Sequence, residues 1–209
     1  MHDNGGGRIS SLELELENGM FELRRGEEFS AELDEDRALS FVRCGVWHIR
    51  AAGGENNVIR IPYGFEAAAV RIRLSGAALS VCDIKAVDIS FRVSRGHLAA
   101  GIASARSISA ELGMGSAVMT AAPSVSAFFE CGSGTMKIAL AGSPSDYRIR
   151  CEHGIGGVTA GGKSLARHET LGNGEKDVFI RCGMGRMELD FSGDTDDLCR
   201  GSAGPVHCF

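Results

Sequence analysis

Aromatic residues, prolines and long apolar runs are all scarce in this sequence. Aromatic residues make up 6% of the 209 residues, and proline occurs 4 times. A core with so few rings must be built from small and branched side chains, which suits a thin, repetitive β architecture better than a helical bundle. No apolar run reaches the roughly 20 residues that a transmembrane helix needs, so we expect no membrane insertion.

Three further absences narrow the classes of function. The chain has no basic stripe and a net charge of −5, which argues against nucleic acid as a partner. Its start, MHDNGGGRISS, has no basic segment followed by an apolar one. We therefore expect no secretory signal and a cytoplasmic protein, with a cell-surface or envelope-associated location as the alternative. The 7 cysteines include no Cys-x-x-Cys pair, which is typical of reduced thiols.

Glycine is abundant, with 29 copies, and it marks an internal repeat. In the middle of the chain, Gly-x-Gly-like bends recur every nineteen residues, and their final position is held by Ala77, Gly96, Gly115 and Gly134. Other copies of the bend end at Gly19, Gly156 and Gly185. The interval from Gly19 to Ala77 is close to three periods, so the repeat is expected to extend over most of the chain.

Apolar and polar residues alternate on both sides of each bend and keep their phase from copy to copy. The position five residues before the end of the bend is always apolar: Leu14, Ile72, Phe91, Ala110, Phe129, Cys151 and Ile180. So is the position two residues after it: Phe21, Leu79, Leu98, Ala117, Met136, Val158 and Met187. One position before the bend is always charged: Glu15, Arg73, Arg92, Glu111, Glu130, Glu152 and Arg181. This alternation predicts strands with one buried face and a ladder of cross-strand charge pairs outside.

The repeat favours one fold class. One copy cannot bury its apolar face alone, whereas stacked copies form a continuous core. We therefore predict an all-β protein, a β-solenoid (β-helix-like) built from strand-turn-strand repeats of nineteen residues. A β-sandwich or a meander of bent hairpins is the alternative. Residues 1–10 are expected to be a flexible N-terminus, 11–193 a single β-repeat domain, and 194–209 a C-terminal tail that caps one end.

The remaining segments are less regular. Between residues 24 and 66 the sequence predicts strands at Glu28–Leu33, Leu39–Cys44, Val46–Arg50 and Val58–Phe65. The longest polar excursion is Gly161–Lys176, where a functional loop is expected. Leu12–Leu16 and Asp177–Phe191 are expected at the two ends of the stack. Exposed end strands could pair with a second copy, so a homo-oligomer is one expected partner state.

Several stretches resemble a known family. These are YRIRCEHGIGGVTAGG at Tyr147–Gly162, VFIRCGMGRMELDF at Val178–Phe191, LELELENGMFEL at Leu12–Leu23 and VIRIPYGF at Val58–Phe65. Together they resemble the bacterial "putative adhesin" family of β-strand-repeat domains, over nearly the whole chain. The resemblance implies a β-solenoid-like fold, no known enzymatic activity, and no catalytic residue to carry over.

Two groups of residues are candidate sites. Cys131, His153 and Cys182 share one inward column, where two thiolates and an imidazole could hold Zn²⁺, although a core of small apolar side chains is the simpler interpretation. Phe128, Arg150 and Phe179 fall in one outward column and are candidates for a partner-binding face. No cofactor is expected.

An enzymatic role finds little support in the sequence. Cys44 with His48, or Cys208 with His207, could form a nucleophile and base, but nothing marks an orienting third group or an oxyanion site. We therefore expect a non-enzymatic structural or interaction module. It would bind a macromolecular protein or cell-envelope partner, or self-associate through its faces. A metal- or thiol-dependent sensor or enzyme that uses the Cys/His ladder is the alternative.

Overall fold

The chain folds into strands joined by short turns. The computed structural model describes residues 8–193, which contain no α-helix and only two short 3₁₀ turns, at Glu35–Arg37 and Pro144–Asp146. The predicted all-β class is therefore confirmed. The strands form one sheet that does not close on itself. Within the described range, no helix has the length and apolar character to span a membrane.

The strands are short near both ends of the described range and long in its middle. In chain order they are β1 (Ser11–Glu17), β2 (Met20–Gly26), β3 (Ser30–Glu32), β4 (Ala38–Arg43), β5 (Val46–Ala52), β6 (Asn57–Pro62), β7 (Glu66–Val81), β8 (Ile84–Cys131), β9 (Thr135–Ala141), β10 (Tyr147–His153), β11 (Gly157–Ala160), β12 (Lys163–Ser164), β13 (Glu169–Leu171), β14 (Lys176–Cys182) and β15 (Arg186–Ser192). A strand, its glycine bend and the strand after the bend make up one unit. The long strands β7 and β8 run through their bends without interruption.

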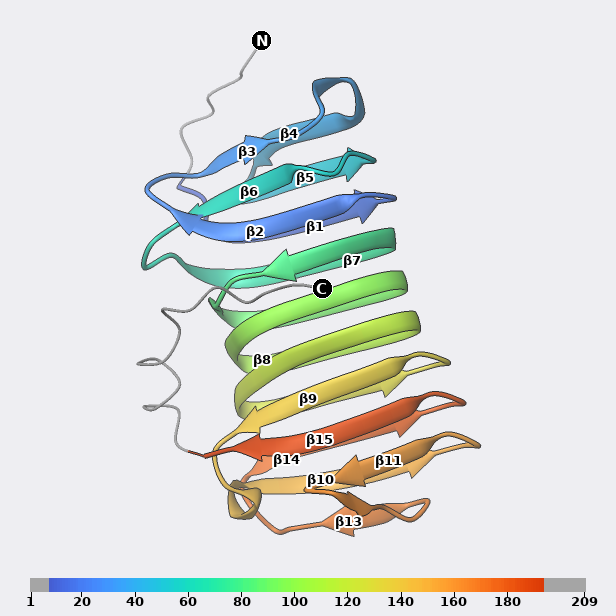
Figure 1. Ribbon diagram of the computed structural model, residues 1–209. Coiled ribbons are helices and arrows are strands. Elements are labelled where there is room, and N and C mark those ends of the chain that lie inside the picture. The colour runs from blue at the N-terminus through green and yellow to red at the C-terminus, as the bar shows by residue number, and fades with distance from the viewer. Residues whose placement is uncertain (1–7, 194–209) are drawn as a thin grey trace.

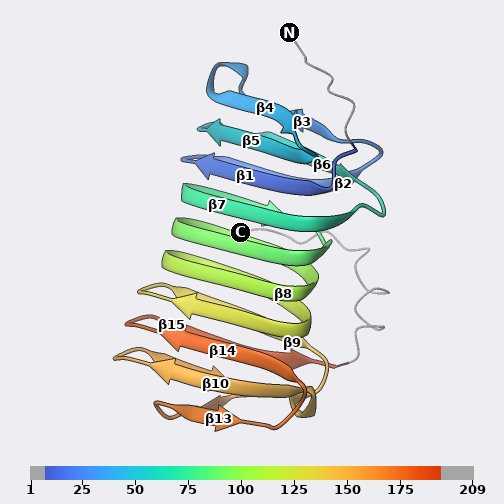
Figure 2. The ribbon, with the colours of Figure 1, turned by 180° about the vertical axis from the view of Figure 1, so that it is seen from behind.

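Neighbouring units pair in parallel at the predicted step of nineteen residues. Val70 of β7 lies beside Ile89 of β8, and Ala117 of β8 lies beside Met136 of β9. Equivalent residues are therefore stacked on one another, unit upon unit. Figures 1 and 2 show the units as a tall stack of ribbons with two faces.

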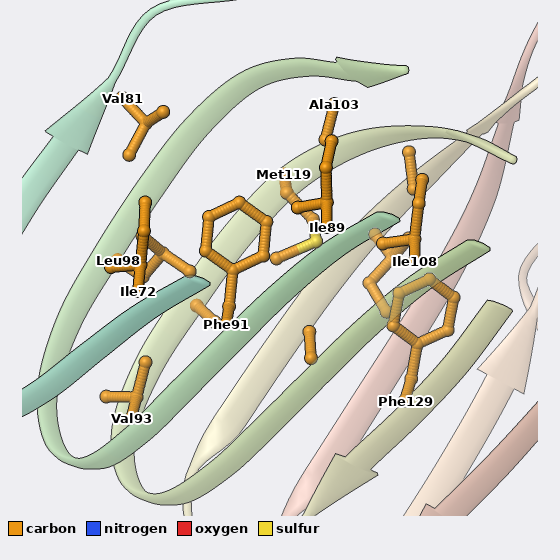
Figure 3. Packing of buried hydrophobic residues seen from close by; sticks show 14 of the residues in the cluster. Ile72, Val81, Ile89, Phe91, Val93, Leu98, Ala103, Ile108, Met119 and Phe129 are labelled. Atoms are coloured by element: carbon orange, nitrogen blue, oxygen red, sulfur yellow. The ribbon is translucent and has the colours of Figure 1, made fainter. Parts of the chain in front are cut away.

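The predicted alternation is confirmed by burial. Every apolar residue of the two columns given above is less than 9% exposed, and the rings of Phe91 and Phe129 are fully enclosed. In Figure 3, the ring of Phe91 lies among Ile72, Leu98 and Met119, and the ring of Phe129 lies near Ile108, between the two faces of the stack. Small and branched side chains fill the core, as the scarcity of aromatic residues predicts.

The bends stack as closely as the strands. Gly96 and Gly115 have φ angles of +140° and +113°, which favour glycine. A Cβ atom on Gly115 would lie 1.9 Å from the carbonyl oxygen of Gly96, and one on Gly96 would lie 2.1 Å from that of Ala77. Glycine is therefore required at both positions because the backbone of one bend rests directly on the next.

The order of the units in space differs from their order in the sequence. β1 lies between β5 and β7, and β14 lies between β8 and β10. The first and last units are thus each one place in from an end of the stack. The prediction that Leu12–Leu16 and Asp177–Phe191 form the ends is wrong, because each segment has a strand on both sides. The interval from Gly19 to Ala77 holds one further unit and two end strands, rather than three periods.

Short antiparallel strands terminate the stack at both ends. β4 pairs with β5 and β3 with β6 at one end, whereas β13 pairs with β10 and β12 with β11 at the other. The excursion Gly161–Lys176 supplies both β12 and β13, so this segment forms an end of the stack. The predicted capping role of the 194–209 tail falls outside the described residues.

The outward charged column forms the predicted cross-strand pairs. Arg181 lies between two carboxylates, with Nη1 3.6 Å from Glu130 Oε2 and Nε 3.8 Å from Glu152 Oε2. At the other end Glu15 lies between two guanidinium groups, those of Arg50 and Arg73. In both places, a unit that lies out of sequence order in the stack puts its charged side chain between two side chains of opposite charge.

Candidate functional site

The three residues proposed from the sequence for partner binding lie on neighbouring strands. In register, Phe128 of β8 lies beside Phe179 of β14, and Phe179 lies beside Arg150 of β10. The two rings stack with centroids 5.8 Å apart and planes 14° from parallel. Arg181 places its guanidinium 5.6 Å from the centroid of Phe179 and covers that ring.

A groove of about 370 Å³ runs beside this aromatic pair. It exists because the outward column changes size along the stack: Arg71, then Ser90 and Ser109, then Phe128. The two serines form the floor, and the larger side chains form the walls. Four successive strands at a spacing of about 4.8 Å separate the walls by roughly 14 Å between backbones. A single extended polymer chain fits this width.

The floor of the groove carries free hydroxyl groups. Ser107 and Ser126, from the neighbouring outward column, lie next to Ser90 and Ser109. Among residues 8–193, none of these four hydroxyls has a hydrogen-bond partner in the protein, and all four serines are partly exposed. The backbone beneath them belongs to the parallel ladder. Recognition on this floor must therefore use side-chain hydroxyls rather than main-chain groups.

Both signs of charge border the groove. Arg71 and Asp88 line it at one side, and Arg150 and Asp177 at the other. Arg148 donates two hydrogen bonds of 2.8 Å to Asp177 and thereby lowers the pKa of that carboxyl. The groove offers balanced donors and acceptors rather than a field of one sign.

The two cysteines of the Cys/His ladder lie in the core, whereas His153 is half-buried at its edge. Cys182 occupies the middle, beside Cys131 on β8 and His153 on β10. Both thiols are at most 1% exposed, and Cys131 Sγ donates to the Gly134 carbonyl oxygen at 3.2 Å. Burial raises the pKa of Cys182 to about 11 and also raises that of Cys131. Thiols in this state are protonated at neutral pH, which makes them poor ligands and poor nucleophiles.

The imidazole of His153 is directed to the backbone of the chain. Its Nε2 lies 3.1 Å from the Leu165 carbonyl oxygen and its Nδ1 lies 3.3 Å from that of Gly154. Within the part of the chain that the structure describes, no three His, Cys, Asp or Glu side chains are grouped so that they could hold a metal ion. The ring therefore joins the β10–β11 bend to the segment that follows β12.

The proposed Cys44–His48 pair is arranged around other partners. Cys44 is exposed in a turn with a φ angle of +51°. His48 has its Nδ1 3.1 Å from Glu13 Oε2, and its ring stacks on Phe41 with centroids 4.9 Å apart. Cys208 and His207 lie outside the described residues.

Comparison with protein-family models and with curated proteins gives no match. Among solved structures, the chain is similar to a "putative cell adhesion protein" from Clostridium sporogenes. The two are 14% identical, and the alignment covers 92% of this chain and 96% of that one with a TM-score of 0.41. At this distance neither a residue role nor a ligand is transferred to this chain.

The sequence did not single out the serines of the groove. Ser90 and Ser109 follow Arg71 at steps of nineteen and precede Phe128 by the same step. Small residues between two large ones in an outward column are a readable signal for a groove. The groove can be predicted in this way only where the register of the repeat is known. Here four neighbouring units follow one another at a constant step of nineteen residues.

Proposed function

We propose that this chain is a β-solenoid that serves as a non-enzymatic interaction module, in line with its resemblance to adhesin-like domains. The observation that carries the proposal is the groove between Arg71 and Phe128. An extended macromolecule lies along the strands there, with one wall formed by the ring of Phe128 and the floor by serine hydroxyls. The lining includes neither histidine nor lysine as a base beside the serine hydroxyls, and the role proposed for the groove is binding.

The chemistry of the lining favours a linear, uncharged glycan as the partner. The C–H face of a sugar ring packs on an aromatic ring, and its hydroxyls exchange hydrogen bonds with serine hydroxyls, carboxylates and guanidinium groups. Balanced charges at Arg71, Asp88, Arg150 and Asp177 match a neutral polymer. A nucleic acid would need a basic surface instead. A peptide strand would need a free sheet edge, and the floor is a sheet face.

Direct binding to defined polysaccharides tests this proposal. Native gels containing soluble neutral polymers (a β-glucan, a mannan, a xylan and a short chitin oligomer in solution) are run with the wild-type protein. We expect retardation by at least one polymer, and an affinity at least about 10-fold lower for Phe128→Ala, because the stacking wall is lost. Tyr63→Ala is the matched control, since Tyr63 is an aromatic residue that is 67% exposed and does not line the groove.

The outcomes separate cleanly. Retardation that falls for Phe128→Ala and for Ser109→Asp but not for Tyr63→Ala supports the groove as a glycan site. Absence of retardation by every polymer, or equal loss in the Tyr63→Ala control, overturns it. Circular dichroism spectra that match the wild type show that each variant is folded.

The solenoid architecture has its own test. Deleting residues 94–112 removes one period from β8 and joins Val93 to Gly113 in phase. A solenoid becomes one unit shorter and still unfolds cooperatively, because each unit contacts only its neighbours. A sandwich or a meander would lose strands that its core requires. Cooperative urea unfolding of the deletion variant supports the solenoid, and a deletion variant without a cooperative transition contradicts it.

A further inference from the structure

The four strands that terminate the stack differ in length, and therefore in how well they are protected against pairing with another chain. β12 has 2 residues, and β3 and β13 have 3 residues each. β4 has 6 residues and pairs with β5 on one side only among the described strands. Short edge strands are the usual protection against pairing with another chain, and β4 lacks it. The backbone groups on the free side of β4 can be satisfied only by water or by another strand.

Apolar side chains gather at the same end. Leu39 and Phe41 are 54% and 40% exposed on the outer side of β4. On its inner side, Ala38 and Val42 pack on the core but remain only partly buried. At the opposite end of the stack, Leu165 packs over the core and is 7% exposed. The β4 end thus combines a free strand edge of 6 residues with apolar side chains that are only partly covered, whereas the exposed Leu171 at the other end lies on a strand of 3 residues.

We propose that two copies of this chain associate through β4 as an isologous dimer, in which β4 pairs antiparallel with β4 of the second copy. A strand edge with unpaired backbone groups is complementary to itself when it is turned by a twofold axis. β3 ends the opposite face of the stack at the same end (Figure 1). One axis normal to both faces therefore also brings β3 toward its own copy, and both faces continue across the dimer.

The dimer has a geometric consequence for the groove, which depends on the function proposed above. One face of the stack is formed by β4, β5, β1, β7, β8 and β14 (Figure 2). The groove lies on this face, because its lining residues come from β7, β8, β10 and β14. An axis normal to the face leaves it pointing in the same direction in both copies. The two grooves therefore open on the same side, and one long polymer or one surface can engage both. Such bivalence raises the apparent affinity without any new contact.

Sedimentation velocity of the full chain at increasing concentration tests the dimer. Pairing of a short strand and its side chains buries an area at the low end of specific interfaces, so we expect a dimer that forms above roughly 10 µM. The double variant Leu39→Lys/Phe41→Lys keeps two outward-facing, exposed positions and places four positive charges across the proposed axis. We expect it to dimerise at least about 10-fold more weakly. Leu171→Lys is the matched control, because Leu171 is an exposed apolar residue on the edge strand of the other end.

Hydrogen exchange provides the second readout. Amide protons of Ala38–Arg43 on the free side of β4 should exchange more slowly at high protein concentration, whereas those of β13 should not change. A wild-type protein that stays monomeric at about 200 µM overturns the proposal. A dimer that is disrupted by Leu171→Lys but not by Leu39→Lys/Phe41→Lys also overturns the proposal. An assembly that grows beyond the dimer overturns it as well. Glycan binding by a monomeric protein would leave the proposed function intact and remove only the dimer.

Discussion

Cys182 lies directly beside Cys131, although β9, β10 and β11 all come between them in the sequence. The contact exists because the last unit of the described chain enters the stack between two earlier ones. Both thiols are consequently sealed in the core, and Cys151 on β10 is equally buried. Three neighbouring units thus each place a thiol inside the protein.

These buried thiols should make the protein sensitive to alkaline pH. Burial raises the pKa of Cys151 and Cys182 to about 11 in the folded state, from an ordinary value of 9.0. The folded state therefore holds more protons than the unfolded state above pH 9. The stabilisation is complete below pH 9 and is lost as pH rises toward 11. We expect Tm to fall over this range, and to fall less steeply in Cys151→Ala. Cys44→Ala, at an exposed thiol, should follow the wild type.

The stacked bends predict a severe effect from one methyl group. In Gly115→Ala, the new Cβ would meet the carbonyl oxygen of Gly96 at 1.9 Å, in a backbone conformation with φ of +113° that alanine disfavours. We expect a loss of about 3 kcal/mol or more in the free energy of unfolding, measured by urea titration. Gly157→Ala is the control, since no atom lies within 4 Å of its Cβ position. Equal stability of the two variants would contradict the close stacking of the bends.

Asn57 is the polar exception in a buried column and should be needed for the turn beside it. It is 4% exposed, and its Nδ2 donates to the carbonyl oxygens of Met20 at 3.1 Å and Gly53 at 2.9 Å. Asn57→Leu leaves two carbonyls without a donor, so we expect a loss of about 1–3 kcal/mol on chemical denaturation. The neighbouring Asn56→Leu, at an exposed position, should change stability by no more than about 0.5 kcal/mol.

Reversing the charge at position 181 should have a small, salt-dependent effect. Arg181→Glu would put three carboxylates in a row with Glu130 and Glu152. The Arg181 side chain is 52% exposed, so solvent screening limits the cost to about 1 kcal/mol at low salt. We expect the difference in Tm from the wild type to shrink in 1 M NaCl. A difference that persists in high salt would instead indicate lost packing on the ring of Phe179.

The sequence was sufficient for the strands and their buried faces, because alternation and the nineteen-residue step are local properties. It was insufficient for the order of the units. The order of the units along the stack depends on which unit lies beside which. The apolar columns do not decide this, because they are nearly the same in all units. The charged column carries the missing information. Glu130 and Glu152 would repel one another as neighbours, and Arg181 between them removes the repulsion.

The candidate site was predicted in part for the same reason. The repeat assigned Phe128, Arg150 and Phe179 to the same outward column and therefore to one face. Their adjacency required the insertion of β14 between β8 and β10, which the repeat alone does not specify. The terminal strands β3 and β4 lie in the segment where the period fails, so their role as an end of the stack was not predicted.

The insertion of the last unit also bears on synthesis at the ribosome. β14 and β15 occupy one place in the stack, between β8 and β10 on one face and between β9 and β11 on the other. A chain halted before Lys176 lacks both strands, so we expect it to expose edges of these four neighbours that β14 and β15 otherwise pair with. Unpaired strand edges of this kind favour aggregation.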